Sequence, residues 1–183
     1  MRGGIRVLLG VASLVAAIAA VGWPLYVTPA SDEPRAVDAV YVIGPPTDFR
    51  MAVAEQMVAD GLTGTVVVSL TDDDGRQAWE RASELCDGAV EIDFSLECRM
   101  PDPFTTRGEA RWLRELVDQH GWESVAVVTF TPHLTRTRVI MERCWSGDIV
   151  YVDSREPITL GYWAYQYAYQ SAAFVKVALE DGC

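Results

Sequence analysis

The chain has 183 residues, half of them hydrophobic, and carries 26 acidic against 15 basic side chains, for a net charge of −11. This length suits one folded domain with a real core, which excludes intrinsic disorder as the main state. The acidic balance excludes nucleic acid as a partner and disfavours attraction of the domain to an anionic membrane surface.

A membrane-spanning pattern opens the chain. Arg2 and Arg6 precede an uncharged run over residues 7–27, which as a helix can cross a hydrocarbon core about 30 Å thick. Because basic residues stay in the cytoplasm, residues 1–6 are predicted to be cytoplasmic and everything after the run extracytoplasmic. A cleaved signal peptide is the alternative, although its apolar stretch is normally only about 7–15 residues long. We therefore expect a retained, single-pass signal anchor in the plasma membrane.

Export constrains the chemistry of the domain. Outside the membrane there is no maintained supply of ATP, NAD or S-adenosylmethionine, so the sequence names no cofactor. The chain has four cysteines, Cys86, Cys98, Cys144 and Cys183, and four cysteines allow three disulfide pairings. Their positions favour Cys86–Cys98 and Cys144–Cys183 without excluding the others. A zinc site is disfavoured, because there is no C-x-x-C and no histidine near a cysteine.

A polar, proline-containing linker over residues 28–37 separates the anchor from a domain over residues 38–183. Strands are predicted over 38–44, 65–70, 89–94, 124–130 and 148–153. Helices are predicted over 50–60, 77–85, 107–120, 132–145 and 160–179. Because strands alternate with helices and several strands are apolar throughout, the pattern predicts a mostly parallel sheet in a three-layer α/β/α, Rossmann-like sandwich.

Ligands of such folds bind beyond the carboxyl ends of the strands. Gly44 follows the first predicted strand, but no G-x-G-x-x-G accompanies it. Asp48 is interpreted either as a helix cap or as an acid or base of the site. Arg50 lies in a first helical turn, where a cation opposes the helix dipole, so it either faces an anion or is a solvated surface residue.

The second predicted strand ends at Ser69 and is followed by an acidic segment, residues 71–75. We expect a capped turn there rather than a calcium loop, because Arg76 occupies the position of a third ligand. Further along, Thr106 and Glu109 form a T-x-x-E capping box, in which each side chain would bond to the other residue's amide.

The most informative stretch is residues 129–138, TFTPHLTRTR. A strand that includes Thr129 leads into a helix start, where free amides attract anions. His133 and Arg136 share one helical face and together suit a phosphate or carboxylate, the arginine through its fork and the histidine through a tunable proton. A metal site would need His133 with Asp48 or Glu109, and since the spacing has no local signature we predict no metal.

The last predicted helix is rich in aromatic residues. Trp163, Tyr167, Gln170 and Phe174 share one face. We expect this face to pack on the core, with a glycan or the bilayer interface as the alternative.

The ordered set of these segments resembles a family of uncharacterised bacterial proteins that includes YdcF, SanA and ElyC, over about residues 38–155. The similarity rests on Ile43-Gly44, Arg50, Ser69, residues 105–110 (TTRGEA) and residues 128–136 (VTFTPHLTR), which look like the family's "VT…H..R" signature. It implies a Rossmann-like fold and, for several members, membrane anchoring and a role in envelope barrier function or peptidoglycan-precursor metabolism. The chain departs from the family at Gly44-Pro45-Pro46 and Ser69-Leu70, where glycine-rich turns are expected.

Together these observations predict a membrane-anchored extracytoplasmic domain that binds a small anionic metabolite of the cell envelope. The expected ligand-binding residues are Gly44, Arg50, Ser69, Thr106, Glu109, Thr129, His133 and Arg136. If the protein is an enzyme, the candidate catalytic residues are Asp48, Glu109 and His133, and a phosphoester hydrolase or transferase is the expected class. The remaining alternative is a non-catalytic partner in an envelope protein complex.

Overall fold

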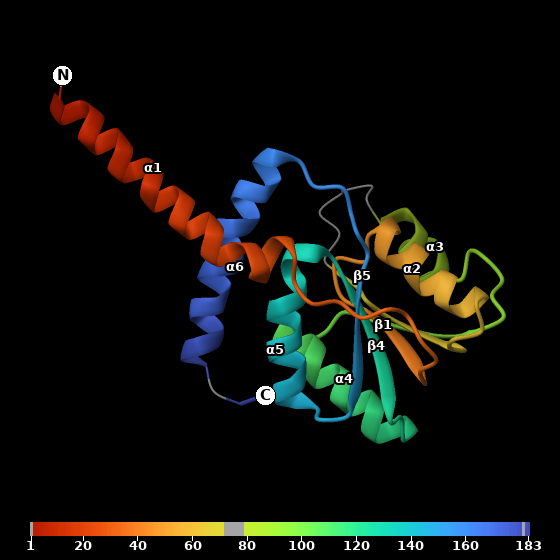
Figure 1. Ribbon diagram of the computed structural model, residues 1–183. Coiled ribbons are helices and arrows are strands. Elements are labelled where there is room, and N and C mark those ends of the chain that lie inside the picture. The colour runs from red at the N-terminus through yellow and green to blue at the C-terminus, as the bar shows by residue number, and fades with distance from the viewer. Residues whose placement is uncertain (1, 72–78, 181) are drawn as a thin grey trace.

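The computed structural model describes residues 2–71, 79–180 and 182–183 (Figure 1). Its centre is a five-stranded sheet in the order β3-β2-β1-β4-β5, and every neighbouring pair of strands is parallel. The predicted α/β fold with a parallel sheet is therefore confirmed. The strands are β1 (Ala39–Val42), β2 (Thr65–Ser69), β3 (Ser95–Arg99), β4 (Ser124–Thr129) and β5 (Asp148–Asp153).

Helices cover both faces of the sheet, because successive strand residues point to opposite sides and both sides are apolar. In β1, Val40 and Val42 pack toward one helical layer, whereas Tyr41 packs toward the other. The first layer contains α2 (Asp48–Ala59) and α3 (Glu80–Cys86), and the second contains α4 (Thr106–His120) and α5 (Leu134–Cys144). A last helix, α6 (Leu160–Leu179), packs on α5 on the outside of this layer (Figure 1).

The chain changes direction across the sheet at β1, which pairs with β2 on one side and with β4 on the other. The connections that leave β1 and β4 therefore diverge, and in folds of this kind ligands bind beyond the carboxyl ends of the strands at such a point. Helix α4 and the short 3₁₀ helix η3 (Thr131–His133) also begin at this end of the sheet. The fold thus brings the predicted strand-end residues to one place.

The predicted strand over residues 89–94 is wrong, since the strand is β3, five residues long, from Ser95 to Arg99. Glu91 and Asp93 are exposed, whereas β3 pairs with β2 at Val68 and Cys98. An edge strand is only half-buried and has a weak apolar pattern, which explains the misplacement. The acidic segment predicted as a turn, over residues 71–75, lies outside the described residues except for its first residue.

The N-terminal helix α1 (Arg2–Gly22) projects away from the body and continues into a π-helical turn, η1 (Trp23–Val27) (Figure 1). The segment Leu8–Val27 is long and apolar enough to be a membrane anchor. Its far end is held on the body, because Thr135 Oγ1 donates a hydrogen bond to the Leu25 carbonyl at 2.7 Å. This apolar N-terminal segment and the domain are therefore in direct contact.

The linker also lies against the domain. Asp32 donates its backbone N–H to the Tyr151 carbonyl at 2.8 Å, and its carboxylate accepts the Tyr151 N–H at 2.8 Å. Val37 donates to the carbonyl of Leu62 at 2.9 Å. The Asp32 bonds lie at the edge strand β5 and the Val37 bond lies at the segment between α2 and β2, so residues 28–37 are not a free tether.

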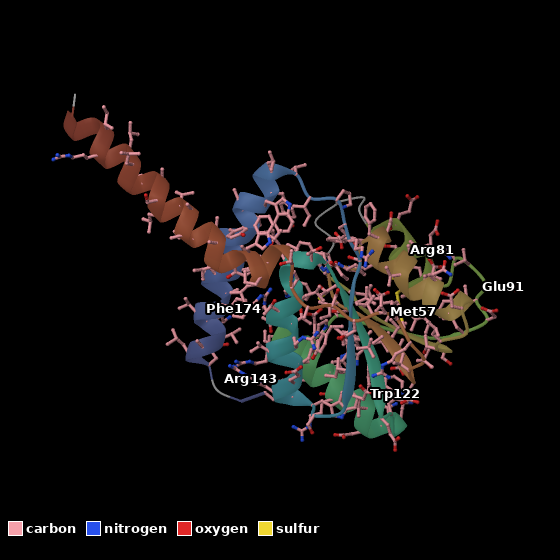
Figure 2. All side chains as sticks on the ribbon, viewed as in Figure 1. Met57, Arg81, Glu91, Trp122, Arg143 and Phe174 are labelled. Atoms are coloured by element: carbon pink, nitrogen blue, oxygen red, sulfur yellow. A yellow bond between two sulfur atoms is a disulfide. The ribbon has the colours of Figure 1, made fainter. Side chains whose placement is uncertain are left out.

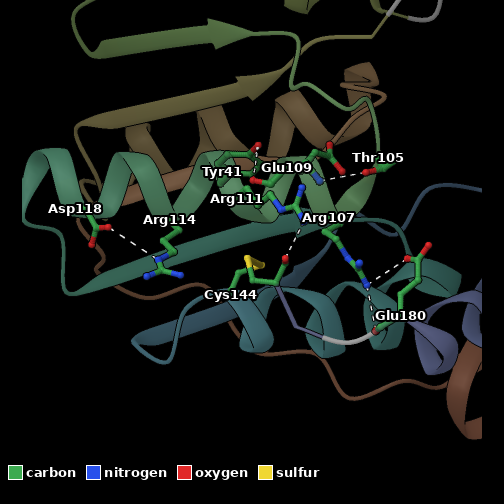
Figure 3. The surroundings of a disulfide bond; sticks show 11 residues. Tyr41, Thr105, Arg107, Glu109, Arg111, Arg114, Asp118, Cys144 and Glu180 are labelled. Atoms are coloured by element: carbon green, nitrogen blue, oxygen red, sulfur yellow. Dashed lines mark hydrogen bonds and ion pairs between the residues drawn. A yellow bond between two sulfur atoms is a disulfide. The ribbon is translucent and has the colours of Figure 1, made fainter.

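Two disulfides, Cys86–Cys98 and Cys144–Cys183, confirm the favoured pairing. The first joins the end of α3 to β3, and the second joins the end of α5 to the segment after α6. Figure 3 shows that α4 also contacts the segment after α6, since Arg111 donates to the Cys183 carbonyl at 2.8 Å and Arg107 pairs with Glu180. Two disulfides with no free cysteine among the described residues indicate an oxidising compartment.

Candidate functional site

Buried polar side chains gather beyond the carboxyl ends of β1 and β4. Those of Ser69, Glu109, Thr129, His133 and Arg136 are each at most 8% exposed. Polar groups are rarely buried in such number without hydrogen-bond partners or a role in a site. We call the following residues the polar cluster: Gly44, Ser69, Thr106, Glu109, Thr129, His133 and Arg136.

The start of α4 differs by one residue from the predicted capping box. The N-cap is Thr105, whose hydroxyl accepts the Gly108 N–H at 3.1 Å (Figure 3). Gly108 is needed there, because a Cβ at this position would lie 1.9 Å from the Pro103 carbonyl oxygen. With Thr105 in the capping role, Thr106 and Glu109 are released from it and both point toward the polar cluster.

Glu109 reaches from α4 to the end of β1. Its carboxylate accepts the backbone N–H of Gly44 at 2.7 Å, and the side chain is only 3% exposed. Burial raises the pKa of Glu109, and this effect outweighs the opposing influence of the Gly44 N–H and of the charges on Arg50 and Arg136. The site therefore contains a carboxyl group that holds its proton more tightly than an exposed glutamate does.

Two hydroxyl groups beside Glu109 have no hydrogen-bond partner among the described residues. They are Ser69 Oγ and Thr71 Oγ1, and both atoms are fully buried. The Ser69 hydroxyl is close enough to lower the pKa of Glu109, yet it makes no well-directed hydrogen bond with the carboxylate. Unpaired buried polar atoms are rare in folded proteins, so these two hydroxyl groups have bonding capacity that the described residues do not use.

A chain of hydrogen bonds links α5, α4 and β4. Arg136 Nη1 donates to Thr106 Oγ1 at 3.2 Å, Thr106 Oγ1 lies 3.4 Å from His133 Nε2, and His133 Nδ1 lies 3.0 Å from Thr129 Oγ1. Because arginine has donors only, the Thr106 oxygen must accept from it and is free to donate to His133 Nε2. This direction is compatible with the tautomer whose proton lies on Nδ1 and is donated to Thr129.

His133 does not supply the tunable positive charge that the sequence suggested. Burial lowers its pKa well below the ordinary value, and the charges of Arg136 and Arg50 lower it further. The imidazole is therefore neutral at pH 7. Its ring nitrogens contact the hydroxyl groups of Thr106 and Thr129.

Arg136 is buried and has no counter-ion among the described residues. Its side chain is 8% exposed, and no carboxylate of the described residues lies within 4.0 Å of it. Its Nε donates to Gln170 Oε1 at 2.8 Å, and its guanidinium lies 5.8 Å from the ring centroid of Tyr169. Desolvation lowers the pKa of Arg136 from its ordinary value, but a guanidinium keeps its charge in proteins. Among the described residues, no carboxylate therefore compensates this positive charge at ion-pair distance.

Arg50 does face an anion, but that anion belongs to the chain. Its Nε donates to Glu156 Oε1 at 2.7 Å, its Nη1 donates to the Ile43 carbonyl at 3.0 Å, and its guanidinium covers the ring of Phe130. The same Glu156 oxygen accepts from Thr47 and Ser154, each at 3.0 Å. Arg50 thus connects the end of β1 to the segment after β5. Sequence reasoning missed Glu156, although its place just after a strand end is the signal that identified the other residues.

Asp48 lies outside the polar cluster. The N-cap of α2 is Thr47, without a side-chain cap bond, and the exposed Asp48 accepts the backbone N–H of Arg81 at 3.2 Å. It therefore caps the first turn of α3 rather than its own helix. The structure does not bring it to the cluster as an acid or base.

The face of α6 that was expected to pack on the core does so only in part. Gln170 is buried, but Trp163, Tyr167 and Phe174 are half-buried, and the last two pack on Tyr26 of η1. The contribution of α6 to the cluster is the bond of Gln170 to Arg136.

No group of three histidine, cysteine, aspartate or glutamate residues within the described ranges is arranged to hold a metal ion. Comparison with family models, with curated proteins and with solved structures found no match for the chain.

Proposed function

We propose that this protein is a single-pass protein of the plasma membrane whose extracytoplasmic domain binds an anionic envelope metabolite, bearing phosphate or carboxylate, in the polar cluster. The apolar anchor preceded by Arg2 and Arg6 supports this orientation, as do the two disulfides. The parallel sheet and the ordered motifs are consistent with membership of the family that includes YdcF, SanA and ElyC. A role in cell-envelope or peptidoglycan homeostasis is part of the proposal on that ground.

The observation that carries the proposal is that the buried Arg136 has no carboxylate partner among the described residues. Removing a charge from water is costly unless an opposite charge compensates it. The Nη2 group of Arg136 makes no hydrogen bond to any described residue, and neither do the backbone N–H groups of Thr106 and Arg107 at the start of α4. A phosphate or carboxylate bound there would receive these donors and the favourable end of the α4 dipole.

The test is a binding titration of the full chain in lipid nanodiscs, with inorganic phosphate and with acetate as separate probes. Arg136→Gln should weaken binding of the preferred probe by at least roughly tenfold, since charge-assisted hydrogen bonds contribute about 1.5–3 kcal/mol each. Arg114→Gln is the matched control, because Arg114 is an exposed arginine on α4 with one weak ion pair at 4.0 Å. Equal binding by the two variants, with both disulfides intact, would overturn the proposal.

A phosphoester hydrolase or transferase is the second candidate function, and Glu109 favours it. A buried carboxyl group with a raised pKa is suited to act as a general acid that protonates a leaving oxygen. Glu109→Gln preserves an acceptor for the Gly44 N–H but cannot donate a carboxyl proton. If the protein is an enzyme of this class, this variant should lose turnover on a panel of phosphoesters while still binding phosphate. No turnover by the wild-type protein on that panel would argue against this candidate.

A further inference from the structure

The first half of α6 presents an exposed face without charge. No charged residue occurs between Glu156 and Lys176, in a chain of which 22% of the residues are charged. Leu160 is 89% exposed, and Tyr162, Tyr165 and Tyr169 are 46%, 54% and 47% exposed. The three tyrosine rings stack along the helix with centroids 5.7 Å apart. We call the three tyrosines the tyrosine face.

The helix α6 is joined directly to the membrane anchor. The Tyr167 hydroxyl donates to the Ala19 carbonyl at 3.2 Å, and the hydroxyl groups of Tyr26 and Ser171 lie 3.1 Å apart. The Tyr167 ring packs so closely on α1 that a Cβ at Gly22 would lie 2.3 Å from it. Figure 1 shows the consequence, because α6 crosses the base of α1 and its first half rises on the side toward which α1 projects.

These contacts determine the depth of α6 relative to a bilayer. Ala19 and Tyr26 both belong to the apolar segment Leu8–Val27, so Tyr167 lies level with the last turns of the anchor. Tyr165 and Tyr169 are two residues away from Tyr167 on either side, within one helical turn. A bilayer spanned by α1 therefore has its headgroup region beside the first half of α6.

We propose that the first half of α6 lies in the headgroup interface of the bilayer, with the tyrosine face against lipid. The inference rests on the proposed anchoring role of α1. Tyrosine is enriched at membrane–water interfaces, because its ring is apolar and its hydroxyl remains hydrated. This face also carries no charge, so an anionic leaflet would not repel it, although the same leaflet would repel the acidic body. A large exposed apolar patch on a soluble surface would otherwise favour association.

The test places a photoreactive benzoylphenylalanine at one position of the full chain in phosphatidylcholine nanodiscs. The three positions are Tyr165, Val15 in the anchor and Glu91, an exposed residue on the side of the body away from α1 (Figure 2). Irradiation at Tyr165 should yield roughly tenfold more lipid adduct than at Glu91, as detected by mass spectrometry. A probe at Tyr162 should behave like the probe at Tyr165.

The four probe positions separate the possible failures. Lipid adducts at Val15 but not at Tyr165 or Tyr162 would overturn the inference and leave the anchor intact. Adducts of Tyr165 with a second copy of the chain in place of lipid would overturn it in favour of self-association. If neither Val15 nor Tyr165 reaches lipid, the anchoring role fails as well. Phosphate binding by the polar cluster is measured separately, so none of these results depends on the ligand.

Discussion

The Glu109 carboxylate accepts the Gly44 backbone N–H at 2.7 Å, across 65 residues of sequence. This bond joins the first turn of α4 to the segment that follows β1. It satisfies an N–H group at a strand end, and it holds an acid between two connections that diverge from the sheet. This hydrogen bond explains why the buried carboxyl group of Glu109 is tolerated in the polar cluster.

Glu109→Gln should change the pH dependence of stability. Because burial raises the pKa of Glu109, the folded state keeps this proton at pH values at which the unfolded state has lost it. The wild-type free energy of unfolding should therefore decrease, relative to the variant, as pH rises from the ordinary glutamate range toward the raised pKa. Urea unfolding at a series of pH values measures this difference, and parallel profiles would contradict it.

Glu109→Leu removes the acceptor as well as the charge. The Gly44 N–H is then left without its partner, and we expect a loss of about 1–3 kcal/mol relative to Glu109→Gln, because unsatisfied buried donors carry their full desolvation cost. The comparison is made by urea unfolding at one pH. Equal stability of the two variants would show that the bond contributes nothing.

Glu156→Ala should be strongly destabilising, because it leaves the Arg50 guanidinium, 2% exposed, without its counter-ion. Removing one partner of a buried pair costs about 3–5 kcal/mol, whereas replacing both by apolar residues is often neutral. The double variant Arg50→Met with Glu156→Leu should therefore recover much of the loss. In contrast, Asp118→Ala, which breaks an exposed pair with Arg114 at 4.0 Å, should cost less than about 1 kcal/mol. Chemical denaturation measures these losses, and an equal loss of unfolding free energy in Glu156→Ala and Asp118→Ala would contradict the structural role of the Arg50–Glu156 pair.

Gly108→Ala should displace the start of α4. The added Cβ would meet the Pro103 carbonyl oxygen at 1.9 Å, and relief of such overpacking costs about 1–3 kcal/mol. Thr106 and Glu109 move with this turn, so phosphate binding should weaken together with thermal stability. Gly161→Ala in α6 is the control, because no atom lies within 4 Å of its Cβ position. Equal melting temperatures for the two variants would contradict the requirement for glycine at position 108.

Loss of the second disulfide should cost more than loss of the first. Cys144–Cys183 closes 39 residues and Cys86–Cys98 closes 12, and chain entropy predicts contributions of about 4 and 3 kcal/mol. Paired Cys→Ala variants, compared by denaturant unfolding, measure both contributions. The reverse order would show that native contacts, rather than loop length, dominate.

Several features were predictable because they depend on local pattern. The apolar runs around Val42, Val68 and Val127 indicated buried parallel strands, and the uncharged run over residues 7–27 indicated the anchor. Since ligands of such folds bind at strand ends, the same pattern indicated Ser69, Glu109 and Arg136 as neighbours. Edge strand β3 was misplaced, because a half-buried strand has no continuous apolar signal.

Charge partners could not be read from the sequence. Arg50 meets Glu156 from 106 residues away, whereas Arg136 receives an amide oxygen from Gln170 and no carboxylate of the described residues. Each arginine lies in the helix that follows a strand, Arg50 after β1 and Arg136 after β4. Only the packing of the segment after β5 and of α6 decides which of them keeps uncompensated charge.

By itself, the sequence determined the parallel α/β domain, the apolar N-terminal segment and the region of the sheet where polar residues meet, since hydrophobic periodicity and the alternation of strands with helices are properties of local segments. The tertiary structure alone decided that Thr105 caps α4, that His133 is neutral, and that α6 lies against the end of α1. These outcomes depend on distances between side chains far apart in the chain, and burial and electrostatic effects change steeply with such distances.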